Sequence, residues 1–326
     1  MCAPRSRGRS SSARPLCARD EKGTALSTTD VTTEEVDGMA TTTAVVDAPS
    51  SDSSPSFAEL GVRPEIVTAL AERGITHTFA IQELTLPLAL GGSDLIGQAR
   101  TGMGKTYGFG VPLLHRISTS DATRELDGTP RALVIVPTRE LCIQVTQDLK
   151  IAATGLTAHT DGRSRPLKVL SIYGGTPYEQ QTEALGKGVD VVVGTPGRLL
   201  DLANQSTLVL GKVEVLVLDE ADEMLDLGFL PDIEKILRMV PEKRQTMLFS
   251  ATMPGPIITL ARTFLTKPTH IRAEAADSGA THENTAQHVY RAHSLDKPEL
   301  VARILQADGR GATMIFCRTK RTAQKL

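Results

Sequence analysis

Short, nearly continuous apolar runs constrain the fold of this chain more than any other sequence feature. They are rich in Val, Ile and Leu, do not alternate with polar residues, and lie at 94–96, 132–136, 168–172, 189–193, 213–218 and 246–249. Strands of this kind are covered on both faces, as in parallel sheets. Between them, stretches with helical spacing lie at 105–117, 140–153, 177–186, 197–204, 230–239 and 254–264. The alternation predicts an α/β fold with a doubly wound parallel sheet.

Composition separates a tail from the α/β domain. Residues 1–56 are rich in Ser, Thr, Ala, Pro and charge without periodicity, and we expect them to be disordered. Ordered sequence begins at Phe57, and residues 57–272 hold the α/β domain. Helical spacing predicts two further helices ahead of its first strand, at 64–73 and 80–90.

A second unit is predicted at the end of the chain. The polar stretch 273–285 indicates a linker, and residues 286–326 follow it. The pattern there predicts a strand at 288–291, a helix at 297–306, a strand at 312–316 and the opening of a helix at Thr319. One strand–helix–strand unit cannot bury both faces of a parallel sheet, so we expect this second unit to be incomplete.

Composition excludes several classes of protein. The formal net charge of −2 over 326 residues excludes nucleic-acid binding through an overall basic field, so a polyanion would be held by local arginines and backbone amides. Aromatic residues make up 3% and Trp is absent, which argues against a base-stacking platform. The four cysteines form no CxxC pair and the seven histidines lack ligand spacing, so we expect a reduced chain without a zinc site. No apolar run reaches the length that spans a bilayer.

The first nineteen residues carry five arginines, many serines and no acidic residue. This composition resembles an organelle transit peptide and lacks the apolar core of a secretory signal. The alternative is a disordered tail, or a start codon placed too early with Met39 as the later start; we favour this alternative because the compositional signal is weak. A cytoplasmic protein is therefore expected, with organelle targeting as the alternative.

A glycine-rich segment after the first apolar run has the spacing G-x-x-x-x-G-K-[ST], with alanine at the first position. Its residues are the candidate nucleotide-binding set: Ala99, Arg100, Thr101, Gly102, Met103, Gly104, Lys105 and Thr106. The glycines let backbone N–H groups turn toward phosphate oxygens at a helix N-terminus. Lys105 would reach the β- and γ-phosphates, and the Thr106 hydroxyl would bind Mg²⁺. A glycine-rich turn without a ligand is the alternative, but the strand before and helix after favour phosphate binding.

Two adjacent carboxylates, Asp219 and Glu220, end the most apolar run of the chain. A buried strand that delivers two carboxylates costs desolvation energy unless a cation or a reacting water uses them. Asp219 is therefore a candidate metal ligand, through water, and Glu220 a candidate base that orients the attacking water. Acids in the first turn of a helix explain this cluster equally well when it is taken alone. With Lys105 upstream, the three residues form the candidate catalytic set of an enzyme that hydrolyses a nucleoside triphosphate.

These motifs and the segments around them resemble the DEAD-box RNA helicases over residues 57–326. Residues 74–82 resemble the family's adenine-reading segment, with Phe57 as the isolated aromatic ahead of it. The resemblance implies that Gln82 bonds to the adenine edge and favours ATP over GTP, whereas the residue alone suggests an ordinary polar helix position. The sequence departs from the family at Ile75, where an aromatic ring is common, and at Thr78, which replaces a proline. Aliphatic packing at Ile75 would then substitute for ring stacking.

Three more strand-to-helix turns offer backbone N–H groups, hydroxyls and arginines, which suit a sugar-phosphate backbone better than base edges. Their residues are Pro137, Thr138, Arg139, Gly174, Gly175, Thr195, Pro196, Gly197 and Arg198. Such turns often arise for structural reasons alone. The family resemblance implies that they form a sequence-nonspecific RNA-binding surface, with Arg139 and Arg198 as the main contacts.

The resemblance also implies a coupling motif. Ser250 and Thr252 follow the run 246–249 and would bond with Asp222, relaying the nucleotide state to the RNA-binding surface. A pair of helix-capping hydroxyls is the alternative. Residues 314–320 resemble the first RNA-contact segment of the family's second domain.

The family has two complete RecA-like domains, and its second carries an H-R-x-G-R-x-x-R-like motif that supplies an arginine finger. No segment here matches that motif, so we expect a fragment truncated within the second domain, which binds adenine nucleotide weakly and does not unwind RNA alone. A catalytically dead RNA clamp that ends at Leu326 is one alternative. Another is a different P-loop NTPase, such as a DNA translocase, against which Gln82 and the Asp-Glu-Ala-Asp sequence argue. The sequence specifies no protein partner.

Overall fold

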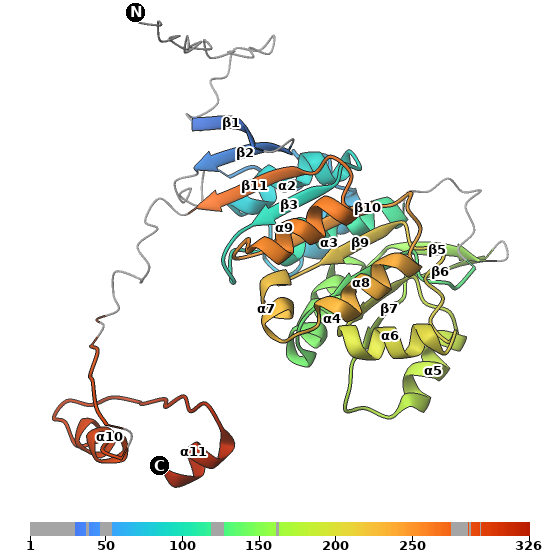
Figure 1. The fold of residues 1–326 in the computed structure, drawn as a ribbon. Helices are drawn as coiled ribbons and strands as arrows, with labels where there is room; N and C mark the ends of the chain where they lie inside the picture. Colours follow the sequence, from blue (N-terminus) through green and yellow to red (C-terminus); the bar gives the residue numbers. More distant parts are fainter. Residues whose placement is uncertain are drawn as a thin grey trace, which may run out of the picture. The chain divides into compact units, whose positions relative to one another are not determined.

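The computed structural model describes residues 30–36, 39–45, 54–118, 127–160, 163–274, 286, 288–293 and 295–326. They belong to two compact units, Met1–Asp277 and Ser278–Leu326, each of which is described by itself. In the larger unit, helices lie against a twisted sheet of mainly parallel strands (Figure 1). The predicted α/β fold class is confirmed.

The strands of the main sheet follow the order β1-β2-β11-β3-β10-β9-β4-β8-β7. All neighbours from β2 to β7 in this order are parallel. The strands within the predicted domain are β3 (Leu95–Gln98), β4 (Ala132–Ile135), β7 (Val169–Ile172), β8 (Val191–Gly194), β9 (Val215–Leu218), β10 (Gln245–Ser250) and β11 (Thr269–Glu274). Each of the predicted apolar runs overlaps one of the first six of these strands.

Two hydrophobic cores explain why the runs do not alternate with polar residues. One core lies against α1 (Pro64–Ala71), α2 (Ala80–Leu90), α3 (Lys105–Ile117) and α4 (Arg139–Ala152). The other lies against α6 (Pro196–Asn204), α7 (Ala221–Asp226), α8 (Leu230–Met239) and α9 (Gly255–Phe264). Within β9, Val217 enters the first core while Leu216 and Leu218 enter the second. Successive side chains of a strand therefore point to opposite faces of the sheet, and both faces are covered by helices.

Several strands were not predicted, because their sequences lack an apolar run. β1 (Asp30–Val36) and β2 (Met39–Val45) pair antiparallel, and β2 pairs in parallel with β11. The rest of the expected disordered tail, up to residue 53, lies outside the described residues. β5 (Thr157–Thr160) and β6 (Arg163–Pro166) form a separate antiparallel pair.

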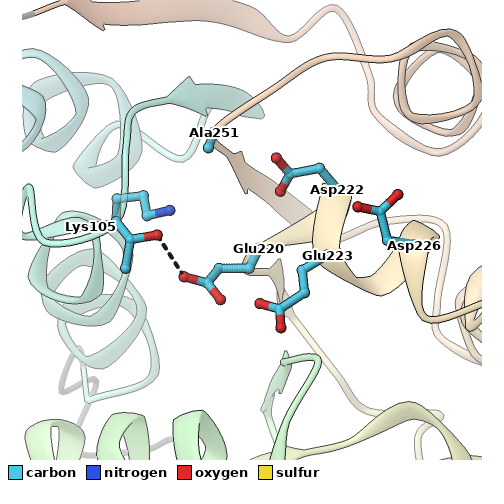
Figure 2. A pocket seen from close by; sticks show the side chains of 7 residues that line it. Lys105, Glu220, Asp222, Glu223, Asp226 and Ala251 are labelled. Carbon is cyan, nitrogen blue, oxygen red and sulfur yellow. Dashed lines mark hydrogen bonds between the residues drawn. The ribbon is translucent and has the colours of Figure 1, made fainter. Parts of the chain in front are cut away.

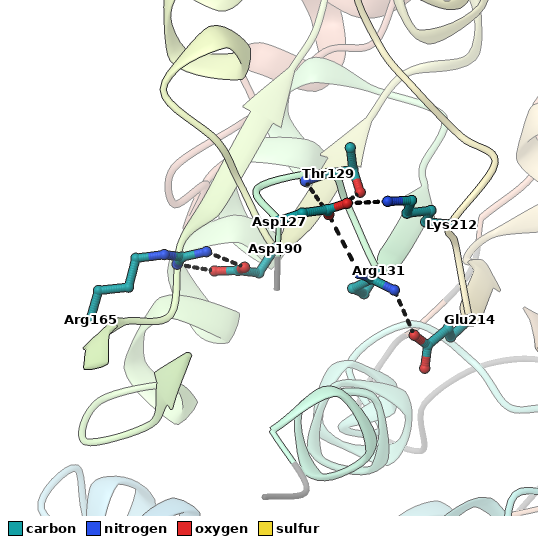
Figure 3. Close-up of polar contacts among 7 residues, drawn as sticks. All are labelled: Asp127, Thr129, Arg131, Arg165, Asp190, Lys212 and Glu214. Atoms are coloured by element: carbon teal, nitrogen blue, oxygen red, sulfur yellow. Dashed lines mark hydrogen bonds and ion pairs between the residues drawn. The ribbon is translucent and has the colours of Figure 1, made fainter. Parts of the chain in front are cut away.

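Ion pairs fasten the end of the sheet at which β4, β8 and β9 begin (Figure 3). The fully buried Asp190, just before β8, accepts hydrogen bonds of 2.7 Å from Nη1 and Nη2 of Arg165 on β6, and one of 2.8 Å from the backbone N–H of Lys168. Arg131, just before β4, pairs with Asp127 and with Glu214, which precedes β9. Ligands of open parallel sheets bind at the carboxyl ends of the strands, so a ligand is expected at the opposite end of this sheet.

The second unit contains helix α10 (Lys297–Leu305), α11 (Lys320–Lys325) and extended segments. The predicted helices at 297–306 and from Thr319 are present, but the predictions of strands at 288–291 and 312–316 are wrong: neither segment is a strand in the structure. A strand needs a neighbour to satisfy its backbone groups, and Val289 and Phe316, at 93% and 89% exposure, pack against little. Among the described residues, no helix has both the length and the apolar character needed to cross a bilayer.

Candidate functional site

The phosphate loop (residues 99–106) connects β3 to α3 at the carboxyl edge of the sheet. Gly102 and Gly104 adopt left-handed φ angles of 87° and 77°, which bend the chain and leave Lys105 as the first residue of α3. A Cβ atom on Gly104 would lie 2.6 Å from Gln82 Nε2 and 2.7 Å from Phe79 Cδ2, so a larger residue there would displace these side chains. The loop thus has the backbone form that the sequence predicted for a phosphate cradle.

Lys105 supplies an unusual charge at this loop. The residue is 6% exposed, and its buried Nζ atom has no hydrogen-bond partner among the described residues. A buried ammonium group without a partner is costly, so the position favours an anionic ligand that would bond to it. Thr106 follows it in the first turn of α3. The residues present therefore fit a polyphosphate.

Asp219 lies at the end of β9 and is 3% exposed. Burial raises the pKa of Asp219 to about 7, against the lowering influence of the nearby Lys105 ammonium. A bound cation would favour the ionised carboxylate in this place. No cluster of three or more His, Cys, Asp or Glu suited to a metal occurs in the described part of the chain. This result is compatible with Mg²⁺, which is commonly held by one or two carboxylates together with substrate phosphates.

Glu220 adopts a left-handed backbone conformation, with φ 52° and ψ 51°. Non-glycine residues adopt this region at a cost of about 1–2 kcal/mol, which surrounding contacts must offset. The turn brings Glu220 to the phosphate loop, where its Oε1 accepts a hydrogen bond of 3.2 Å from Thr101 Oγ1. The two motifs that the sequence placed apart therefore touch.

A pocket of about 220 Å³ lies at this junction (Figure 2). It is lined by Thr101, Lys105, Glu220, Asp222, Glu223, Asp226 and Ala251. Glu223 was not among the predicted site residues; its hydrogen bond with Glu220 and its burial raise the pKa of Glu223 to about 7. Its spacing in the sequence could have identified Glu223, because a residue three positions after Glu220 lies about one helical turn further on. The pocket combines a lysine with several carboxylates, the groups that bind a nucleotide phosphate and a cation.

Gln82 and Phe57, the predicted adenine-reading residues, lie in different surroundings. Gln82 is 1% exposed, and its Nε2 donates to the Gly104 carbonyl at 2.7 Å while its Oε1 accepts from the Phe79 N–H at 3.0 Å. It therefore joins the segment 74–82 to the phosphate loop. Phe57 is 1% exposed and packs in the core, so the structure does not bring it to the surface of the site. Phe79, which was not predicted, is 58% exposed beside Gly104.

The structure brings the predicted coupling residues together. Asp222 donates its backbone N–H to Ser250 Oγ at 3.2 Å, and its carboxylate accepts from Thr252. Gln98, just before the phosphate loop, was not predicted; its Nε2 donates to the Ala251 carbonyl at 3.3 Å. The segment 250–252 therefore contacts both the acidic residues that follow β9 and the residue that precedes the phosphate loop.

The three turns predicted to hold a sugar-phosphate backbone follow β4, β8 and β7, which are adjacent in the sheet. Thr138 caps α4, and its hydroxyl accepts from the Leu141 N–H at 3.2 Å. Two arginines reach the turn after β7. Arg139 Nη1 lies beside Gly175, 3.7 Å from the position that a Cβ atom would occupy there. Arg198 Nη1 donates to the Thr176 carbonyl at 3.1 Å.

The other predicted residues of these turns are partly buried: Pro137 and Pro196 are buried, whereas Gly197 is exposed. Thr195 precedes α6, which begins with the buried Pro196 and the exposed Gly197, and Gly174 and Pro137 belong to the turns after β7 and β4. All three turns lie at the carboxyl ends of their strands, as does the pocket.

Comparisons with known proteins identify the family of this chain. The family model for DEAD/DEAH box helicase matches residues 79–260. The DEAD-box ATP-dependent RNA helicase CshA of Streptococcus pneumoniae is 43% identical over 270 residues, which cover 83% of this chain and 48% of that protein. The DEAD-box ATP-dependent RNA helicase 3A, chloroplastic, of Zea mays is 42% identical over 274 residues, covering 83% and 35%.

A solved structure is similar as well. The crystal structure of a DEAD box protein from the hyperthermophile Methanococcus jannaschii matches with a TM-score of 0.59 and 34% identity, covering 83% of this chain and 68% of that one. The chain spans about half the length of the curated CshA relatives that it matches.

Proposed function

Because the chain belongs to the DEAD/DEAH box helicase family, we propose that it forms the nucleotide-binding part of an enzyme that remodels RNA in an ATP-dependent, sequence-nonspecific manner. The observation that carries the proposal is the buried Lys105 Nζ, which has no hydrogen-bond partner in the part of the chain that the structure describes, in a pocket where Thr101 of the phosphate loop bonds to Glu220. A site of this kind suits a polyphosphate on one side and a reacting water on the other.

The proposed roles follow from position. Lys105 and the loop N–H groups would bind the phosphates of ATP, and Thr106 and Asp219 would hold Mg²⁺, which neutralises phosphate charge when bound. Glu220 would orient the attacking water and accept its proton. The Gln82 amide keeps a second N–H and a second lone pair beyond its two bonds, so an adenine contact would add to them.

The proposed RNA contacts are the turns that carry Arg139, Gly175 and Arg198. They lie on the same edge of the sheet as the pocket, and they offer arginines and helix N-termini that suit phosphate groups. Such contacts carry no base information, which supports sequence-nonspecific binding.

A titration with a fluorescent ATP analogue in Mg²⁺ tests the nucleotide site. Lys105→Ala should abolish binding, whereas Lys150→Ala, which removes an exposed lysine on α4, should leave it unchanged. Undiminished binding by Lys105→Ala would contradict the proposal.

Turnover is tested in the chain extended to the length of its relatives. There, Glu220→Gln should retain nucleotide binding and lose RNA-stimulated hydrolysis. Equal turnover by the wild type and Glu220→Gln would remove the catalytic role of Glu220. Absence of turnover in the wild type as well would favour a module that binds nucleotide and RNA without catalysis.

A further inference from the structure

Arg198 packs against an aromatic ring that no motif includes. Its guanidinium carbon lies 3.9 Å from the centroid of the Tyr178 ring. Tyr178 is the first residue of α5 (Tyr178–Gly186), and Arg198 lies in the first turn of α6. The stack therefore joins the N-terminal ends of two helices that follow neighbouring strands, β7 and β8.

Further contacts fix the ring and the guanidinium group. The Tyr178 hydroxyl donates to Oδ2 of Asp201, one turn after Arg198 on α6. Arg198 Nη1 donates to the Thr176 carbonyl at 3.1 Å. Asp201 and Arg198 both belong to α6. This one helix therefore binds the hydroxyl of Tyr178 through Asp201 and covers the face of its ring with Arg198. The arrangement limits the rotation of both side chains.

The stack lies beside one of the turns that are proposed to contact RNA. The turn that contains Gly175 and Thr176 lies between Arg198 and Arg139, whose Nη1 is 3.7 Å from the place of a Cβ on Gly175. A guanidinium group has five N–H donors, and the Thr176 carbonyl occupies one. An arginine held in this way loses less side-chain entropy when it binds a phosphate than a freely rotating one.

We propose that Tyr178 is a positioning residue for RNA: its ring holds the Arg198 guanidinium in the orientation that contacts the sugar-phosphate backbone of a single strand. The inference rests on the RNA-binding function proposed above. Tyr178, which is 37% exposed, acts through Arg198 and not by stacking on a base.

A double-mutant cycle tests the inference. The affinity of the protein for a fluorescein-labelled oligouridylate is measured by anisotropy at several salt concentrations, with Mg²⁺ and a non-hydrolysable ATP analogue. Arg198→Ala should weaken binding by about tenfold and reduce the salt slope by about one. Tyr178→Ala should weaken it by about threefold. The double variant should bind no more weakly than Arg198→Ala, because removal of the arginine leaves the ring nothing to position.

Tyr178→Phe keeps the ring face and loses only the bond to Asp201, so its loss of affinity should be smaller than that of Tyr178→Ala. Thermal unfolding of each variant confirms that the fold is retained. Losses that multiply in the double variant would overturn the inference, because Tyr178 would then contact RNA itself. An unchanged affinity of Tyr178→Ala would also overturn it while leaving the proposed function intact. Absence of RNA binding by the wild type would instead refute the proposed function.

Discussion

Oδ2 of Asp222 accepts hydrogen bonds from both the backbone N–H and the hydroxyl of Thr252, each 2.8 Å long. Asp222 follows the catalytic candidates at the end of β9, and Thr252 follows β10, the neighbouring strand. Ala99 at the start of the phosphate loop also donates its N–H to the Ser250 carbonyl at 3.1 Å. The short segment after β10 therefore ties the acidic residues to the loop that would hold the phosphates.

The Asp222–Thr252 contact should make stability depend on acid pH. Burial alone raises the pKa of Asp222, but hydrogen bonds from Thr252 and Ser250 outweigh it and keep the pKa below its usual value. Since the folded pKa is depressed, the stabilisation is complete above the unfolded pKa of about 4 and is lost as pH falls through the folded pKa. Thr252→Val should lower the free energy of unfolding by about 1 kcal/mol at pH 7, and by less at pH 3. Urea denaturation at both pH values measures the difference; a constant difference would contradict the account.

Gly104 and Gly102 offer a matched pair of substitutions in the phosphate loop. Both residues have left-handed φ angles, of 77° and 87°, so alanine at either costs about 1–2 kcal/mol in backbone strain. A Cβ on Gly104 would also meet Gln82 Nε2 at 2.6 Å, whereas one on Gly102 has no atom within 4 Å. Gly104→Ala should therefore lower the melting temperature and the ATP affinity further than Gly102→Ala does. Equal effects of the two variants would show that the contact with Gln82 is unimportant.

Arg165 is expected to be a strong stabilising residue far from the pocket. Its loss would leave the fully buried Asp190 carboxylate without its counter-charge (Figure 3). Arg165→Ala should reduce the free energy of unfolding by about 3–5 kcal/mol. Lys187→Ala is the control, because it breaks a solvent-exposed pair with Glu183 whose contribution to stability is small. Similar losses in the two variants, measured by chemical denaturation, would refute the assignment.

Much of the central sheet could be predicted because burial on both faces leaves a direct trace in the sequence. The run that ends at Leu218 became β9, and the glycine pattern before Lys105 became a left-handed turn into α3. β11 and the β5–β6 pair are polar or mixed and gain their partners only in the folded chain. The opposite failure occurred at 312–316, an apolar segment that pairs with no strand among the described residues. Strand formation there depends on pairing and not on local preference.

The candidate site was predictable where a motif fixes the chemistry, and less so where tertiary contacts do. Lys105 and Glu220 line one pocket, and Asp219 lies near enough to both for their charges to influence its pKa, as expected from strands that are parallel in one sheet. The left-handed turn at Glu220 and the ring of Tyr178 beneath Arg198 could not be inferred, because neither has a local sequence signal. The family resemblance points to Phe57, which is buried in the core; a resemblance can name a residue without giving its surroundings.

The most direct test of the central claim is the effect of Mg²⁺ on ATP affinity in the wild type, Lys105→Ala and Asp219→Asn, measured by calorimetry with Mg²⁺ and with EDTA. If Lys105 and Asp219 hold the same Mg·ATP, Lys105→Ala should not bind under either condition. Asp219→Asn should bind ATP in EDTA like the wild type and lose about tenfold or more of the Mg²⁺ enhancement. A full Mg²⁺ enhancement in Asp219→Asn would contradict the claim, because the carboxylate and the phosphate loop would then serve different ligands.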